Sequence, residues 1–198
     1  YLIYKNKILD AKKVIDKARK KYNSNLLIKQ TNNFIINKKN KKFKNFFNCK
    51  NPKHVIAEIF YILANLYSGE ENYLMSNFYL KLSFYLNNKF LPNKTLFAEN
   101  LFYQKKYNKS KKVYNSLKSI GENYSWYSAL SISKILSDNA EEKNSILKIE
   151  KEFNLLKKPN YEHYFEIANF YKDNGSYDES VKYYSLALND IKKSHYLF

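Results

Sequence analysis

A pattern of aromatic and small residues recurs along the chain with a period of about 34 residues, and no other feature limits the fold as strongly. A unit of this length cannot bury its apolar face alone, so neighbouring copies must stack on one another. The pattern is clearest over residues 161–194. There the bulky and small positions are Tyr164, Ile167, Ala168, Tyr171, Gly175, Tyr177, Ser180, Tyr184 and Ala187.

The same frame fits two upstream windows, 57–90 and 91–124, which abut without an insertion. The matching residues are Phe60, Leu63, Ala64, Tyr67, Tyr73, Ser76, Leu80 and Ser83 in the first, and Phe97, Ala98, Leu101, Tyr107, Ser110, Tyr114 and Leu117 in the second. The window 125–160 fits less well. Its counterparts of three second-helix positions are Asn144, Lys148 and Lys151, so we expect a shift of register there.

Each window reads as two helices, because its apolar residues follow helical spacing and no alternating strand pattern occurs. Small residues at repeat positions 8, 20 and 27 allow the helices to approach closely, and aromatic residues at positions 11, 17 and 24 fill the remaining space. Near the start, Ala11, Ile15 and Ala18 fit the second helix of a repeat whose first helix is mostly missing. Residues 26–56 are predicted to form a degenerate repeat with a shortened second helix.

These positions together resemble the tetratricopeptide repeat family. The segment 78–86, followed by Leu91 and Pro92, reads as a second helix that runs into the next repeat and is similar to bacterial scaffold members of that family. The resemblance covers 57–198 well and 1–56 loosely. It implies an all-α fold, a right-handed α-solenoid of antiparallel helix pairs with about five repeats. The expected organisation is a basic N-terminal part, 1–56, followed by an array, 57–198, with repeats 57–90, 91–124, 125–160 and 161–194.

The resemblance also implies a non-enzymatic scaffold whose first helices line a concave groove for a peptide or a partner helix. Carried over by repeat position, the groove residues are Tyr61, Asn65, Glu99, Phe102, Tyr103, Trp126, Phe165 and Asn169. Rings supply contact area at low entropic cost, and asparagine amides pair with the backbone of an extended ligand. For each ring the alternative is that it closes the core between repeats. The carboxylate clamp of some family members is not expected, because only Asn65 fits it.

The charge is concentrated near the N-terminus. The chain has 35 Lys and Arg against 18 Asp and Glu, a net charge of +17, and residues 1–55 hold 16 of the basic residues but only two acidic ones. The densest segment contains Lys38, Lys39, Lys41, Lys42 and Lys44. Such a patch favours phosphate, so a nucleic-acid-associated module is the second functional hypothesis. A solvated, lysine-rich face is the alternative, since the chain has a single arginine, the residue that base-reading sites usually recruit.

Other classes of function find little support in the residues. One cysteine, Cys49, excludes an intrachain disulfide and a thiolate zinc cluster, and His54 nearby has no further ligand beside it. Three glycines leave no glycine-rich phosphate loop, and no acid–base pair stands out. We therefore expect no enzyme activity, cofactor, metal, small-molecule substrate or transmembrane segment. The chain opens with Tyr1 rather than Met, so we expect that more chain once preceded it, and the sequence fits a cytoplasmic or an exported protein.

Overall fold

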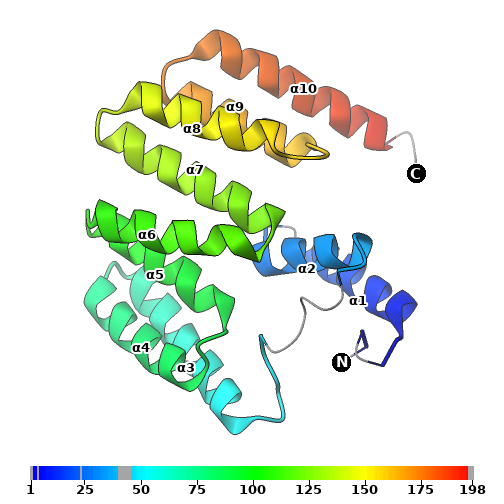
Figure 1. Ribbon diagram of the computed structural model, residues 1–198, viewed down its shortest axis with the longest axis vertical. Coiled ribbons are helices and arrows are strands. Elements are labelled where there is room, and N and C mark those ends of the chain that lie inside the picture. The colour runs from blue at the N-terminus through cyan, green and yellow to red at the C-terminus, as the bar shows by residue number, and fades with distance from the viewer. Residues whose placement is uncertain (1, 4, 23, 40–45, 196–198) are drawn as a thin grey trace. The chain divides into compact units, whose positions relative to one another are not determined.

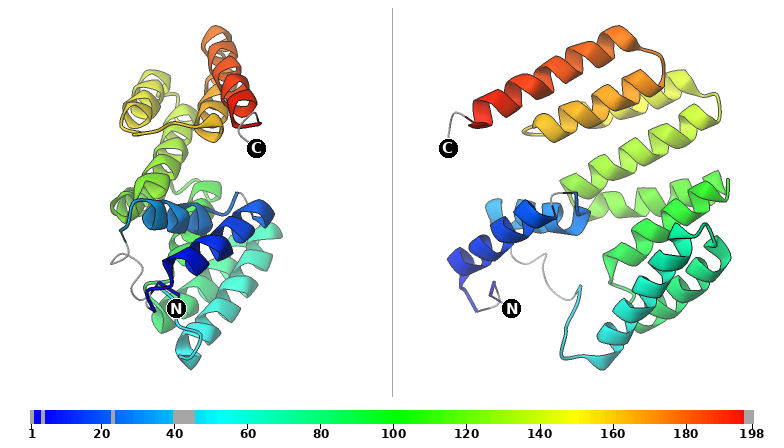
Figure 2. Two further views of the ribbon diagram at one scale, coloured as in Figure 1. Left: turned by 90° about the vertical axis from the view of Figure 1, so that its right-hand side faces the viewer. Right: turned by 180° about the vertical axis from the view of Figure 1, so that it is seen from behind.

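The protein is all-helical in the computed structural model, which describes residues 2–3, 5–22, 24–39 and 46–195, with side chains up to residue 191 (Figures 1 and 2). Within these residues no strand occurs, as the helical spacing predicts. The elements are α1 (Ile8–Lys21), α2 (Leu26–Ile36), α3 (Pro52–Gly69), α4 (Tyr73–Leu86), α5 (Leu91–Tyr103), α6 (Tyr107–Leu117), the short η2 (Lys118–Ile120), α7 (Glu122–Asp138), α8 (Glu142–Asn154), α9 (Tyr161–Asp173) and α10 (Tyr177–His195).

Packing divides the chain into two compact units, residues 1–124 and 125–198. Unit 1 contains α1 and α2 and the antiparallel pairs α3–α4 and α5–α6. Unit 2 contains α7 beyond its first turn, α8, and the pair α9–α10. The proposed repeat boundaries stay a prediction, because the units are defined by packing rather than by repeat register.

Asparagine starts four of these helices. A side-chain oxygen at the N-terminus of a helix accepts a hydrogen bond from a backbone N–H group that has no partner within the helix. In α9 the cap is reciprocal, since Asn160 accepts from the His163 N–H at 3.3 Å and the His163 ring accepts from the Asn160 N–H at 3.3 Å. The caps are Asn25, Asn51, Asn72 and Asn160. Four of the 27 asparagines of the chain therefore serve to begin helices.

The turn after a first helix has the same backbone geometry each time. At the end of α5, the N–H of Lys105 donates to the carbonyl of Phe102 and the N–H of Lys106 to that of Leu101, both at 2.8 Å. This is the Schellman motif, and it places one residue in the left-handed region. The residues with positive φ at these turns are Lys38, Glu71, Lys105, Ala140 and Gly175. The last four lie 34 or 35 residues apart, a spacing close to the period of the sequence pattern.

The turn at Ala140 also explains the weak fit of the window 125–160. Counted from this turn, the frame of that window moves by one residue. The counterparts of positions 20 and 24 are then Ser145 and Ile149, both fully buried, instead of Asn144 and Lys148. The expected shift of register is thus caused by one residue inserted before Ala140.

A glycine at one of these turns is expected to stabilise the protein. Lys105 has φ 57°, a conformation that is unfavourable for a residue with a Cβ atom. Lys105→Gly should therefore raise the free energy of unfolding by about 0.5–1 kcal/mol, measured by urea denaturation. The control Lys112→Gly, an exposed position inside α6, should lower it by about 1 kcal/mol. A loss of stability in Lys105→Gly would contradict the role given to this turn.

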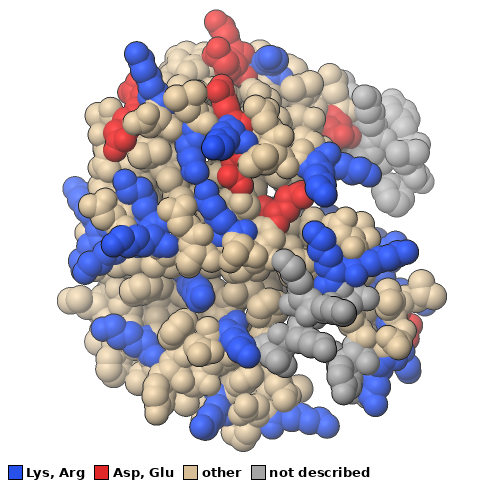
Figure 3. Space-filling view, viewed as in Figure 1, with Lys and Arg blue, Asp and Glu red and all other residues tan. Residues whose placement is uncertain are grey.

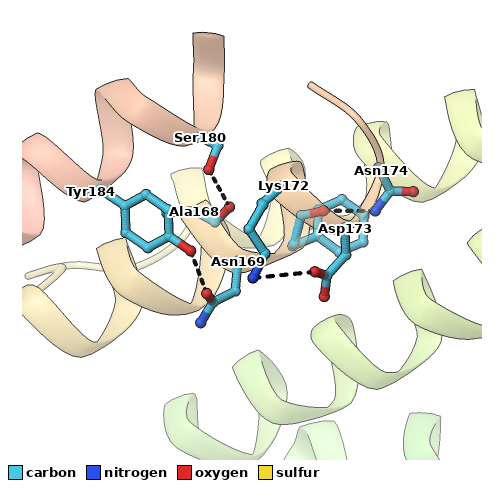
Figure 4. A network of polar contacts seen from close by, with 8 residues as sticks. Ala168, Asn169, Lys172, Asp173, Asn174, Ser180 and Tyr184 are labelled. Atoms are coloured by element: carbon cyan, nitrogen blue, oxygen red, sulfur yellow. Dashed lines mark hydrogen bonds and ion pairs between the residues drawn. The ribbon is translucent and has the colours of Figure 1, made fainter. Parts of the chain in front are cut away.

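Small residues bring paired helices together as the repeat pattern predicts. Ala98 on α5 and Ser110 on α6 are fully buried, and the Ser110 hydroxyl donates to the Ala98 carbonyl at 2.8 Å. The same contact joins α9 to α10, where Ser180 donates to the carbonyl of Ala168 at 2.9 Å (Figure 4). In both pairs a serine at position 20 faces an alanine at position 8. Larger side chains at these positions would push the two helices apart.

The helices α1 and α2 form a small hairpin within unit 1, closed by Ala11, Ile15 and Ile35. Gln30 fixes α2 to the start of α7, since its side-chain oxygen accepts from the Asn123 N–H at 3.0 Å. Gly121 permits this contact, because a Cβ atom at that position would lie 2.3–2.6 Å from atoms of the Gln30 side chain. The N-terminal hairpin is thus anchored by a buried polar contact as well as by its own apolar residues.

Candidate partner-binding surface

The predicted groove residues lie on the first helices α3, α5, α7 and α9. On α3 and α5, Tyr61 is half-buried and its ring meets Phe90 edge-on at 5.4 Å, while Asn65 is exposed. Burial raises the pKa of Tyr61, and the nearby negative charge of Glu99 raises it further. The Tyr61 phenol is therefore protonated at neutral pH, and Glu99 lies close enough to act on it. Tyr61, Asn65 and Glu99 form the polar part of this surface.

An aromatic patch lies at the C-terminal end of α5. Tyr103 is 58% exposed, and its ring stacks on Tyr73 with centroids 5.7 Å apart and planes 8° apart. Phe102 meets the Tyr103 ring edge-on at 5.3 Å and also contacts Tyr107 at 5.8 Å. The sequence assigned Tyr73 and Tyr107 to packing positions at the start of second helices. Tyr107 joins this patch because α6 begins close to the end of α5, and Tyr73 joins it because the start of α4 in the preceding helix pair lies beside the end of α5. We call Tyr73, Phe102, Tyr103 and Tyr107 the α5 aromatic patch.

Trp126 on α7 is a core residue of unit 2. Its ring is 4% exposed and belongs to the buried cluster around Ala129 and Ile167. It meets Phe153 and His163 at centroid distances of 5.9 and 5.6 Å. The one-residue shift of register accounts for this burial, because it moves Trp126 from repeat position 2, which lines the groove in the family, to position 1. Each predicted groove ring could either line the groove or close the core between repeats. Trp126 closes the core.

The residues on α9 retain accessible surface. Phe165 is 52% exposed and packs at 5.6 Å against Tyr184 of α10. The Tyr184 hydroxyl donates to the side-chain oxygen of Asn169 at 2.5 Å, as Figure 4 shows. The amide nitrogen of Asn169 has no hydrogen-bond partner in the described part of the chain. Tyr184, which the sequence assigned to packing, thus orients both predicted site residues of this helix.

The predicted basic patch is described only in part. Lys38 and Lys39 are exposed in the turn after α2, and their N–H groups cap that helix by donating to the carbonyls of Ile35 and Phe34. Lys41, Lys42 and Lys44 lie outside the described residues. The two described lysines are thus fixed through the backbone and keep their side chains in solvent.

The described residues contain no group of three or more His, Cys, Asp or Glu side chains that could hold a metal ion. Cys49 is exposed, and the His54 ring accepts a hydrogen bond from the Asn48 N–H at 3.0 Å. His54 therefore has a structural contact at the entry to α3. None of the described helices combines the length and apolar character needed to cross a bilayer.

Comparison with known proteins gives one structural match. No protein-family model matches the sequence, and no curated protein matches it. The structure is similar to that of a tetratricopeptide repeat protein from Parabacteroides merdae, with a TM-score of 0.53 and 16% sequence identity. The match covers 96% of this chain and 74% of that protein. At this identity the likeness concerns the fold, and it agrees with the repeated positions, the helix pairs and the recurring turn. The chain has the helical-repeat fold of a tetratricopeptide repeat protein.

Proposed function

We propose that the protein is a non-enzymatic scaffold that binds a peptide or a partner helix along its first helices. In unit 1 the proposed surface consists of Tyr61, Asn65, Glu99, Phe102 and Tyr103. In unit 2 it consists of Phe165 and Asn169. The fold supports a protein partner, since stacked helical repeats present extended surfaces for binding.

The observation that carries the proposal is the α5 aromatic patch. An exposed tyrosine usually loses rotamer freedom when a partner covers it, and this loss weakens binding. Tyr103 is already held by its stacking on Tyr73, although more than half of its surface faces solvent. A ring that is both ordered and accessible is suited to act as an anchor for a partner.

Polar groups beside the rings supply directional contacts. The exposed amide of Asn65 can pair with a peptide backbone, and the protonated phenol of Tyr61 is a donor at neutral pH. In unit 2, the amide nitrogen of Asn169 offers a further donor next to the exposed ring of Phe165. Each unit therefore presents an aromatic residue next to an asparagine on a first helix, the combination expected for recognition of an extended segment.

The test is capture of partners from an extract of the source organism by the full chain, with and without nuclease. Proteins bound through the proposed surface should still be captured after nuclease treatment. Their affinity should fall five- to thirtyfold with Tyr103→Ala, which corresponds to about 1–2 kcal/mol for an anchor ring. Tyr22→Ala and Tyr177→Ala are matched controls, because these tyrosines are 51% and 68% exposed and lie outside the surface. Equal losses in the controls, or capture that disappears with nuclease, would contradict the proposal.

A further inference from the structure

A cavity of about 470 Å³ opens between α4, α5 and α6 of unit 1. Its volume lies within the range of sites that bind ligands. The lining residues are Leu80, Lys81, Phe84, Tyr85, Asn93, Lys94, Phe97, Val113 and Ser116. None of them belongs to the surface proposed above, so the cavity is a separate feature of the fold.

The walls of this cavity are apolar. Leu80 is buried and Phe97 is partly buried in the cluster that joins α4 to α5. Two of the neutral polar groups already have partners: Asn93 is 1% exposed and donates to the Ser83 hydroxyl at 2.8 Å, and the Ser116 hydroxyl donates to the carbonyl of Val113 at 2.7 Å. A ligand would therefore meet carbon atoms along most of the cavity.

Two lysines supply the charge at this cavity. Lys81 on α4 and Lys94 on α5 have no hydrogen bond or ion pair with any residue that the structure describes. Residues 73–117 carry eight lysines and one carboxylate, Glu99. Glu99 acts on Tyr61 and is not among the lining residues. Figure 3 shows lysine side chains over α4 to α6, with no acidic side chain among them in that view. The surroundings of the cavity therefore favour an anion.

The apolar surface continues beyond the cavity along α4. Phe84 is 41% exposed and Tyr85 is 87% exposed, so two large rings stand at its edge. Rings at the rim of an apolar pocket suit a macromolecular partner, because a small ligand would leave them in water. A peptide that places one side chain in the cavity also covers this rim.

From these contacts we infer that the cavity between α4, α5 and α6 binds an acidic peptide segment. A bulky apolar side chain of the segment enters the cavity against Leu80, Phe97 and Val113. Aspartate or glutamate residues flanking that side chain pair with Lys81 and Lys94. This site shares no residue with the first-helix surface, so either proposal can be wrong without affecting the other.

The probe is a phage-displayed library of random twelve-residue peptides, selected on the full chain and counter-selected on Ser116→Trp. Ser116 is exposed at the wall of the cavity, so an indole at this position fills it without entering the core. We expect the selected peptides to share one bulky apolar residue flanked by Asp or Glu. The strongest peptide, synthesised with a fluorescent label, should lose at least tenfold in affinity with Ser116→Trp and less than twofold with the control Ser119→Trp, outside the lining.

The charge is tested with two double variants of equal net charge. Lys81→Glu with Lys94→Glu should lower the affinity for the labelled peptide at least tenfold. Lys89→Glu with Lys112→Glu, at exposed lysines outside the lining, should lower it less than threefold. Far-UV circular dichroism should show unchanged helicity in all variants. The inference is overturned if no peptide is selected or if the selected peptides lack acidic residues. It is also overturned if both double variants lose the same affinity for the peptide, or if palmitate displaces the peptide and binds more tightly.

Discussion

Replacing Trp126 by alanine is expected to lower the free energy of unfolding by about 3–5 kcal/mol. The ring is 4% exposed and packs between Phe153 and His163 in the main apolar cluster of unit 2. Alanine would leave a cavity that the rigid helices α7 and α9 can fill only in part. Urea denaturation followed by far-UV circular dichroism measures the loss, because the variant has no tryptophan left for fluorescence.

Two controls separate packing from partner binding at this position. Trp126→Phe keeps most of the apolar contact but removes the indole N–H that donates to Glu166 at 2.5 Å, so a smaller loss is expected. Phe165→Ala, at a ring in the same unit that is 52% exposed, should change the free energy of unfolding by less than about 1 kcal/mol. Wild-type stability in Trp126→Ala, together with loss of a partner, would instead make Trp126 a binding residue.

The helix pairs were predictable because packing between repeats imposes a regular spacing on the sequence. A serine hydroxyl that reaches the carbonyl of the facing helix needs small residues at two fixed positions, as at Ala98 and Ser110. The hydroxyl contact joins α5 to α6 and α9 to α10, and small residues recur at these two positions in all four proposed repeats, so their spacing is visible without a structure. The recurring turn adds little to the sequence signal, because only Gly175 among its left-handed residues is a glycine.

It was harder to predict on which side of its helix each aromatic ring lies. One inserted residue turns a helix by about 100°, which is enough to move a side chain from a groove into a core. This is the case for Trp126, whose window contains one additional residue before Ala140. The shifted frame places Ser145 and Ile149 at a small and a bulky position, a signal that was present in the sequence. Testing neighbouring frames within each window would have found it.

The cavity between α4, α5 and α6 had no signal of its own in the sequence. It depends on side chains from three helices, and repeat positions alone do not show where such side chains leave space. The charge around it was hidden by averaging, since residues 56–198 together hold 19 lysines and 16 acidic residues, whereas residues 73–117 hold eight lysines and one acidic residue. A charge count over shorter segments shows this excess.

A second large loss of stability is expected for Asn100→Asp, which keeps the shape of the side chain but replaces its amide by a carboxylate. Asn100 is fully buried on α5 and joins three helices. Its oxygen accepts from the Ser68 hydroxyl of α3 at 2.7 Å, and its amide nitrogen donates to Ser76 and Asn77 of α4 at 2.7 and 3.0 Å. The carboxylate removes both donors and buries a charge, which should lower the free energy of unfolding at pH 7 by about 3 kcal/mol.

The pH dependence of this loss identifies its cause. Burial disfavours the charged form, so the pKa of the introduced carboxyl should be higher in the folded protein than in the unfolded chain. The folded state then binds a proton more readily, and the deficit should shrink as the pH falls through the folded pKa. Urea denaturation of wild type and variant at pH 7 and pH 5 measures this change. Asn65→Asp, at an exposed asparagine of α3, should differ from wild type by less than about 0.5 kcal/mol at both pH values. A deficit in Asn100→Asp that does not change with pH would mean that the lost donors, and not the buried charge, weaken the contact between the three helices.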